Sequence, residues 1–222
     1  PEGSTPDKVD YVVFFFHGSM ANRRQFQGMF DGLFHVPEGK KEDINFMCVC
    51  YDALGCGESE KPYDTDAYTV DKLVADASAI FDKYAKPDGG NIVLGHSFGT
   101  TVCARIRHTI KAPVAATLLL GTAHTMATPI YLFWLPLWIL NLIRQQLSDG
   151  FLEKAFSPAT PMEERVKLQD ATGIKNEMYA VKFFYNTLCW ASDEDWSALQ
   201  GPALIIQGAD DAITTPEAAE DL

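Results

Sequence analysis

Residues 91–101 of the chain read NIVLGHSFGTT, a short apolar run that breaks into Gly-His-Ser-Phe-Gly and continues into small residues. This order predicts a strand, a sharp turn and a helix, with Ser97 at the apex of the turn. Gly95 and Gly99 lack the Cβ atoms that would collide in so tight a turn. The amide of Phe98, where the helix begins, would face an oxyanion formed beside Ser97. Because a bare G-x-S-x-G pattern also fits a glycine-rich loop with a chance serine, the flanking sequence has to decide.

The composition of the chain predicts one globular unit. It has 222 residues, of which 47% are hydrophobic, enough to bury a sizeable core. The formal net charge of −12 disfavours nucleic acid or an anionic membrane held by charge, since both need a basic patch. The five cysteines stand at unrelated spacings without a CxxC pair, so we expect reduced packing residues, no metal site and no cofactor. Unpaired cysteines and the lack of a recognisable signal peptide favour a cytoplasmic or peripheral membrane location.

An uninterrupted apolar run, residues 9–16, precedes the tetrapeptide His17-Gly18-Ser19-Met20. β-branched and aromatic residues in such a run predict a strand buried on both faces of a parallel sheet. The glycine lets the backbone turn close to a substrate, and the amide of Ser19, or that of Met20, is placed to be a second oxyanion donor. We predict that His17 supports this loop through a hydrogen bond rather than transferring a proton.

A second apolar strand, residues 44–51, ends in a glycine-rich loop, D-x-x-G-x-G-x-S, at residues 52–59. Asp52 and Ser59 can bond the backbone N–H groups of this loop. A phosphate-binding loop is the alternative, but the sequence lacks the motifs of such loops here, so we predict a supporting role. Amphipathic patterns follow both strands, at residues 22–34 and at residues 69–84, where Thr69 is the expected N-cap. Strands that alternate with helices predict an α/β fold with a parallel sheet.

Three motifs, HGSM, DALGCGES and GHSFG, follow the three predicted strands in this order. In order and spacing they resemble the α/β-hydrolase superfamily, and the resemblance covers nearly the whole chain. Within the superfamily the chain is most similar to the lidded abhydrolase-domain esterases and lipases. The helix ending DKYAK, residues 82–86, is part of this resemblance. The resemblance implies an α/β-hydrolase fold and a serine hydrolase. Ser97 would be the nucleophile, the Ser19 and Phe98 amides the oxyanion hole, and an acid followed by a histidine would complete the triad.

The strand–helix alternation is lost from residue 122 to about residue 197. The lidded esterases and lipases that the chain resembles carry a helical lid at this position. We therefore predict a core over residues 1–121, a lid over 122–197 and a return to the core over 198–222. Residues 126–143 carry no charge and many aromatic side chains. A transmembrane helix is the alternative, but the stretch has the minimum length and contains two prolines. The aromatics either pack the lid on the core, line a channel for an apolar substrate, or contact a lipid surface.

A last predicted strand, residues 203–207, leads into Gly208-Ala209-Asp210-Asp211. The resemblance places the triad acid at the fourth position of G-x-x-D, which is Asp211, with Asp210 as the alternative. The triad base should follow the acid, yet all five histidines precede Asp211. We therefore expect this sequence to be an internal piece of a longer protein, without two strands that precede residue 9 and without the catalytic histidine.

Several side chains are expected to contact the substrate rather than to transfer protons. His124, at the start of the predicted lid, is the histidine that we expect near Ser97. The complete set of expected substrate contacts is His17, Met20, His96, His124, Trp134 and Trp138.

Three functions fit these expectations. The first is a serine hydrolase that cleaves a carboxylic ester, thioester or lipid acyl bond through an acyl-enzyme. The second is a non-catalytic pseudo-hydrolase that binds a partner protein or a lipid, and the third is an acyltransferase or lyase on the same fold. For the first function the expected partner is a small-molecule or lipid ester, with lipid contact through the lid and no nucleic acid.

Overall fold

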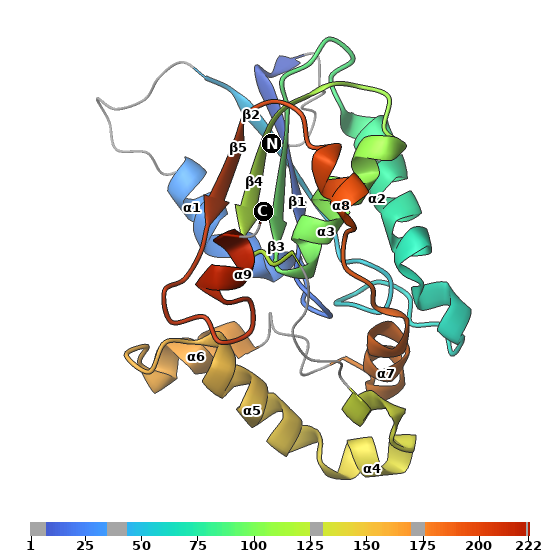
Figure 1. The fold of residues 1–222 in the computed structure, drawn as a ribbon. Helices are drawn as coiled ribbons and strands as arrows, with labels where there is room; N and C mark the ends of the chain where they lie inside the picture. The colour runs from blue at the N-terminus through green and yellow to red at the C-terminus, as the bar shows by residue number, and fades with distance from the viewer. Residues whose placement is uncertain (1–7, 35–43, 125–130, 170–175, 221) are drawn as a thin grey trace.

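The fold is built on a parallel β-sheet, as the sequence predicts. The computed structural model describes residues 8–34, 44–124, 131–169, 176–220 and 222. Within these residues the sheet has five strands in the order β2-β1-β3-β4-β5, and each neighbouring pair is parallel. The strands are β1 (Tyr11–Phe16), β2 (Phe46–Cys50), β3 (Asn91–His96), β4 (Val114–Leu120) and β5 (Ala203–Ile206). Helices lie on both sides of the sheet, which gives an α/β fold (Figure 1).

The interior strand β1 is buried on both faces, and its alternate side chains belong to different cores. Phe14 and Phe16 belong to the larger cluster, which includes residues of α2, α3 and α7. Phe15 belongs to a second cluster with Phe26, and residues of α1 pack against it. Successive side chains of a strand point to opposite faces, so a run of apolar residues can fill two cores at once.

Helices α1 (Gln27–Phe34), α2 (Val70–Tyr84) and α3 (Phe98–Arg105) connect the first strands. Helix α1 covers one face of the sheet, whereas α2 and α3 cover the other (Figure 1). Thr69 is the N-cap of α2, but its side chain makes no capping bond. Its hydroxyl donates instead to the backbone oxygen of Asp66, at 3.4 Å. The cap position was therefore predicted correctly, and the capping bond was not.

The segment between β4 and β5 consists of helices and the loops that connect them in its described part. We call residues 131–197 the helical insertion. It contains the 3₁₀ helix η5 (Tyr131–Trp134) and the helices α4 (Leu137–Leu142), α5 (Arg144–Ala155), α6 (Met162–Gln169), α7 (Met178–Thr187) and α8 (Asp193–Ser197). Helices α4, α5 and α6 lie beyond the carboxyl ends of the strands (Figure 1).

The long apolar stretch at residues 126–143 is divided between η5 and α4 where the structure describes it. Residues 126–130 lie outside the described residues. No helix in the described ranges is long and apolar enough to cross a membrane. The apolar side chains of this stretch are distributed between buried positions, such as Leu140, and exposed ones, such as Trp138.

Candidate active site

Ser97 lies between the end of β3 and the start of α3, in a conformation that residues other than glycine rarely adopt. Its φ is 51° and its ψ is −121°. A Cβ atom on Gly95 would lie 2.3 Å from the Gly99 backbone oxygen, and one on Gly99 would lie 2.0 Å from the Phe16 backbone oxygen. The two glycines therefore allow β3, α3 and the end of β1 to approach as closely as this turn requires.

The loop after β1 contacts this turn directly. The Ala21 amide donates to the Gly18 backbone oxygen at 3.1 Å, and Met20 has a φ of 52°, as the third residue of a type II turn does. We call residues 18–21 the oxyanion turn. A Cβ atom on Gly18 would lie only 3.3 Å from the Cβ of Ser97. Among the described residues, Met20 and Ser97 are the two non-glycine residues with a positive φ, so backbone strain is concentrated where the two loops meet.

Three backbone amides of these two loops have no hydrogen-bond partner among the described residues. Phe98 is the first residue of α3, and the first amides of a helix have no partner within it. In the ranges that the structure describes, no hydrogen bond is formed by the amides of Ser19, Met20 or Phe98. These groups are the donors that the sequence assigns to an oxyanion hole.

The oxyanion turn is held by side chains from two other parts of the chain. Gln25 accepts a hydrogen bond from the Gly18 amide at 3.2 Å. Asn176, just before α7, donates from its side-chain amide to the backbone oxygen of Met20, and its own backbone oxygen accepts from the Arg144 guanidinium at 2.7 Å. Asn176 is buried. Sequence reasoning missed this residue, because no local pattern marks a contact between residues so far apart in the chain.

His17 connects the loops that follow β1 and β2. Its Nδ1 lies 2.8 Å from the Gly18 backbone oxygen, and its Nε2 accepts from the Ala53 amide at 2.9 Å. This is the supporting hydrogen bond that we expected of His17. Burial lowers the pKa of the imidazole, which agrees with an uncharged ring whose Nε2 is an acceptor. Because His17 is buried and both ring nitrogens are bonded, the expected substrate contact of this residue is wrong.

Asp52 supports the loop after β2 as the sequence predicts, whereas Ser59 bonds a backbone oxygen instead of an N–H group. Asp52 accepts hydrogen bonds from the amides of Arg23, at 2.7 Å, and Glu58, at 3.0 Å. The Ser59 hydroxyl donates to the Asp52 backbone oxygen at 2.5 Å. The Arg23 guanidinium forms an ion pair with the same carboxylate. These bonds fix the loop whose Ala53 amide holds His17.

Asp211 lies in the loop after β5, and its carboxylate is held by the loop itself. Oδ1 accepts from the amides of Ile213, at 2.8 Å, and Thr214, at 2.9 Å, and Oδ2 accepts from the Thr214 hydroxyl at 2.8 Å. Oδ2 would lie 3.6 Å from a Cβ atom on Gly121, at the end of β4. The neighbouring Asp210 points elsewhere and accepts from the Ser157 hydroxyl of the helical insertion at 2.6 Å. Of the two candidate acids, Asp211 therefore lies toward the end of β4 and Asp210 toward the helical insertion.

His96 lies between the oxyanion turn and the Asp211 loop. Its Nδ1 would be 3.0 Å from a Cβ atom on Gly18, and its Nε2, like Oδ2 of Asp211, would be 3.6 Å from a Cβ atom on Gly121. Burial lowers the pKa of His96 to about 4, against the opposing attraction of Asp211. Nδ1 is buried and has no hydrogen-bond partner in the described part of the chain. Burial therefore favours the uncharged imidazole of His96, which lies near Asp211.

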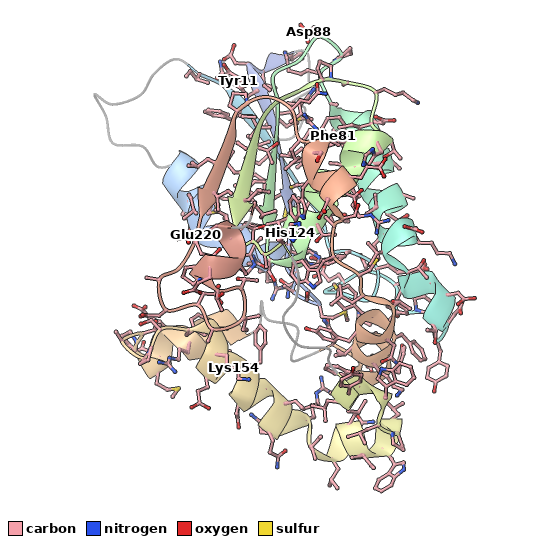
Figure 2. The ribbon with its side chains drawn as sticks, in the orientation of Figure 1. Tyr11, Phe81, Asp88, His124, Lys154 and Glu220 are labelled. Carbon is pink, nitrogen blue, oxygen red and sulfur yellow. The ribbon has the colours of Figure 1, made fainter. Side chains whose placement is uncertain are left out.

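His124, by contrast, is turned toward α8. Its Nε2 lies 2.8 Å from a carboxylate oxygen of Asp193, and its amide donates to the Ala218 backbone oxygen; Figure 2 shows it between α3 and α9. The expectation that His124 contacts the substrate near Ser97 is therefore not what the structure shows. In the described ranges no histidine forms a hydrogen bond with the Ser97 hydroxyl, and no group of three or more His, Cys, Asp or Glu side chains could hold a metal ion.

A cavity of about 360 Å³ separates the oxyanion turn from the helical insertion. Ser19 and Met20 border it on one side, and the substrate contact of Met20 stays a prediction. Trp134 and Trp138 do not line it, and these residues are 75% and 69% exposed. The expectation that these two tryptophans contact the substrate is therefore wrong. Apolar side chains of η5, α5 and α7 line the cavity instead, among them Phe133, Leu147, Phe151, Met178, Val181 and Tyr185.

The chain is similar in sequence and in fold to known proteins. The sequence pattern of the alpha/beta hydrolase family matches residues 12–222. Human Protein ABHD8 is 26% identical over 215 residues, which cover 95% of this chain and 46% of ABHD8, so the chain spans about half the length of this relative. The enol-lactonase from Burkholderia xenovorans superposes with a TM-score of 0.76 at 17% identity, over 99% of this chain and 78% of that one. A hydrolase from Pseudomonas aeruginosa superposes with a TM-score of 0.73 at 18% identity, over 95% of this chain and 76% of that one. These two structures show the shared fold.

Proposed function

The chain belongs to the alpha/beta hydrolase family, and on that premise we propose that it is a serine hydrolase that cleaves a carboxylic ester, thioester or lipid acyl bond through an acyl-enzyme on Ser97. The observation that carries the proposal is the contact between the two strained loops. The Cβ of Ser97 lies 3.3 Å from the Cβ position of Gly18, so the nucleophile and the amides of the oxyanion turn border the same small space. Strained conformations of this kind persist where the surrounding structure holds them and are concentrated at active sites.

In the proposed reaction the Ser97 hydroxyl attacks the carbonyl carbon of the substrate. The carbonyl oxygen becomes an oxyanion, and the Phe98 amide and the Ser19 or Met20 amide donate hydrogen bonds to it. A single donor of this type contributes about 10² to 10³ in rate. The leaving group departs with a proton, which leaves an acyl group on Ser97, and water then attacks this acyl group and releases the acid.

The base of the reaction is a histidine imidazole that Asp211 orients. A carboxylate in this role holds the imidazole and stabilises it once it is protonated. Asp211 suits the role because three hydrogen bonds from Ile213 and Thr214 fix its carboxylate. Since no imidazole in the described ranges bonds the Ser97 hydroxyl, the proposal assigns the base to a histidine outside them.

A fluorophosphonate probe tests the proposal on the full-length protein. We expect covalent labelling at Ser97, located by mass spectrometry, and no labelling of Ser97→Ala. Hydrolysis of a p-nitrophenyl ester should fall by about 10⁴ to 10⁶ in the same variant. Ser192→Ala, which removes the N-cap hydroxyl of α8, is the matched control and should keep both activities.

If the probe does not label Ser97 in folded full-length protein, the protein is non-catalytic and the proposal is wrong. Labelling at Ser97 with products other than the free acid would indicate acyl transfer or bond cleavage by a lyase on the same nucleophile.

A further inference from the structure

We propose that helix α7 positions the oxyanion hole, and that the hydroxyl of Tyr185 does so by holding Ser19. Phe184, the residue before Tyr185, contributes by packing on Phe98. The inference rests on the proposed function, because it concerns the amides that would bind the oxyanion of that reaction. It gives the helical insertion a part in the chemistry itself.

The side chain of Phe98 packs directly on α7. The centroid of its ring lies 5.0 Å from that of Phe184, and the two ring planes are nearly perpendicular, at 89°. Edge-to-face pairs of this kind are favourable, and both side chains are buried. Because Phe98 is the first residue of α3, this contact fixes the residue whose amide is one of the proposed oxyanion donors.

Tyr185 follows Phe184 on α7 and reaches the other oxyanion loop. Its hydroxyl shares a hydrogen bond with the Ser19 hydroxyl, at the wall of the cavity that both residues line. The phenol ring stacks on Phe133, with centroids 4.4 Å apart and an angle of 11° between the planes, and its centroid lies 5.2 Å from that of Phe184. These two ring contacts hold the phenol in place, so its hydroxyl meets Ser19 from a fixed position.

The phenol of Tyr185 is a neutral hydroxyl at the pH values at which ester hydrolysis is assayed. Burial raises its pKa to about 12, against a smaller opposing effect of the hydrogen bond with Ser19. A neutral phenol both donates and accepts hydrogen bonds, so it can hold the Ser19 hydroxyl without placing a negative charge beside the oxyanion. A phenolate at this position would oppose the charge that develops in the transition state.

Together with Tyr185, two other side chains hold the oxyanion turn from outside. Gln25 accepts from the Gly18 amide, and Asn176 donates to the Met20 backbone oxygen. Asn176 lies two residues before α7 and Tyr185 lies in the last turn of that helix, so both ends of α7 contact the turn. A turn that is fixed at its side chain and at its backbone leaves its free amides little freedom to rotate away from an oxyanion.

These contacts place α7 on the oxyanion side of the site. In Figure 1, α7 lies on the same side of the molecule as α3, whereas α9 (Pro216–Glu220) and the loop that carries Asp211 lie on the other side. A substitution that removes only a hydroxyl from α7 should therefore change the oxyanion hole and leave the acid in place.

Tyr185→Phe removes the hydroxyl and keeps the ring that stacks on Phe133. Tyr179→Phe is the matched control, because it removes a hydroxyl from the same helix that donates to the Lys61 backbone oxygen at 2.7 Å, outside the cavity. In the full-length protein, Tyr185→Phe should lower kcat for p-nitrophenyl acetate about tenfold and change KM by less than about twofold, because the amides act on the transition state. Tyr179→Phe should leave both constants within about twofold. Similar midpoints of urea unfolding in the two variants would show that lost stability is not the cause.

A double-mutant cycle with Ser19→Ala shows whether Tyr185 acts through Ser19. Each single variant should lose about tenfold in kcat, and the double variant should lose about as much as either one, since both substitutions remove the same bond. A loss of about a hundredfold in the double variant would mean that the two residues act separately, and the positioning role would then be wrong. The same conclusion would follow if Tyr185→Phe were as active as Tyr179→Phe.

The order parameters of the Ser19 and Met20 amides, measured by NMR relaxation, test the positioning independently of the reaction. They should fall in Tyr185→Phe and keep their wild-type values in Tyr179→Phe. If they fall as expected while the wild type is neither labelled at Ser97 nor active on the ester, α7 positions the turn and the hydrolase proposal is wrong. Unchanged order parameters in Tyr185→Phe would overturn the inference and leave the hydrolase proposal intact.

Discussion

The side-chain amide of Asn176 donates a hydrogen bond to the backbone oxygen of Met20, a residue 156 positions earlier in the chain. Met20 has a φ of 52°, a conformation that costs free energy for a residue with a side chain. Asn176 is only 5% exposed, so water does not replace this bond readily. The helical insertion therefore contributes directly to the backbone geometry of the oxyanion turn.

Asn176→Leu should weaken both the fold and the proposed chemistry. The substitution keeps a side chain of similar size but leaves the Met20 oxygen without this donor, and an unsatisfied buried polar group costs about 1–3 kcal/mol. We expect a loss of that size in the free energy of unfolding, measured by urea denaturation. In the ester assay we expect kcat to fall more than KM rises, because the amides of the turn act on the transition state.

Asn141→Leu is the matched control for this variant, because Asn141 is an exposed residue of α4. It should change the free energy of unfolding by less than about 0.5 kcal/mol. If Asn176→Leu were as stable and as active as Asn141→Leu, the bond to Met20 would contribute nothing measurable.

Gly99→Ala should destabilise the protein strongly. Its Cβ would lie 2.0 Å from the Phe16 backbone oxygen and 3.0 Å from that of His17, and backbone atoms cannot move aside as the end of a side chain can. We expect a loss of more than about 3 kcal/mol in urea denaturation, or a failure to fold. Gly32→Ala in α1, where a Cβ meets nothing within 4 Å, should instead stabilise the helix by up to about 1 kcal/mol. Similar stabilities of the two variants would contradict the close approach of β1 and α3.

The parts of the site that are local in sequence were predictable, and the parts made by distant residues were not. The turn around Ser97 and the tetrapeptide that begins at His17 could be predicted because strand, glycine and helix follow one another within a few residues. The bond from Asn176 to Met20 has no such signal, since any buried asparagine could supply it. The expectation for Trp134 failed for a related reason. Phe133 and Trp134 are neighbours in a single turn of 3₁₀ helix, but Phe133 is buried against Tyr185 while Trp134 faces solvent. Composition does not show which of the two side chains faces inward.

Acidification should destabilise the protein through its buried histidines. Burial lowers the pKa of His96 from 6.5 to about 4, and it also lowers the pKa of His17. Below pH 6.5 the unfolded chain binds more protons at these residues than the folded chain does, so the free energy of unfolding is greatest above that pH and falls as the pH decreases. One such histidine changes the free energy of unfolding by about 1.4 kcal/mol per pH unit in this range.

Urea denaturation at pH 7.5 and pH 5.0 measures this effect. The wild type should lose up to about 2 kcal/mol between these values through His96, and a further amount through His17. His96→Gln should lose less, because one of the two titrating groups is gone. His108→Gln, at a histidine whose side chain is 41% exposed, should lose as much as the wild type. An equal loss in His96→Gln and the wild type would show that His96 is not responsible.

Asp52 should contribute much more to stability than its charged neighbour Glu58. The Asp52 carboxylate is 3% exposed and accepts from two amides as well as from the Arg23 guanidinium. Asp52→Ala leaves these donors without an acceptor and should cost about 3–5 kcal/mol. The Glu58 side chain is 71% exposed in its pair with Arg23, so Glu58→Ala should cost less than about 1 kcal/mol in urea denaturation. Comparable losses in the two variants would mean that burial does not decide the strength of these interactions.

Of the five cysteines, Cys189 should react with a thiol reagent much faster than the others in the native protein. It is exposed, whereas Cys56 and Cys103 are buried and Cys48 and Cys50 are half-buried. Burial raises the pKa of Cys48 to about 11 and that of Cys50 to about 12, and the thiolate is the reactive form. Titration with dithionitrobenzoate should therefore show a single fast thiol that Cys189→Ser removes and Cys48→Ser leaves, with all five thiols reacting in urea. A second fast thiol in the native protein would show that strand β2 opens more readily than its packing against the sheet implies, because Cys48 and Cys50 both lie on that strand.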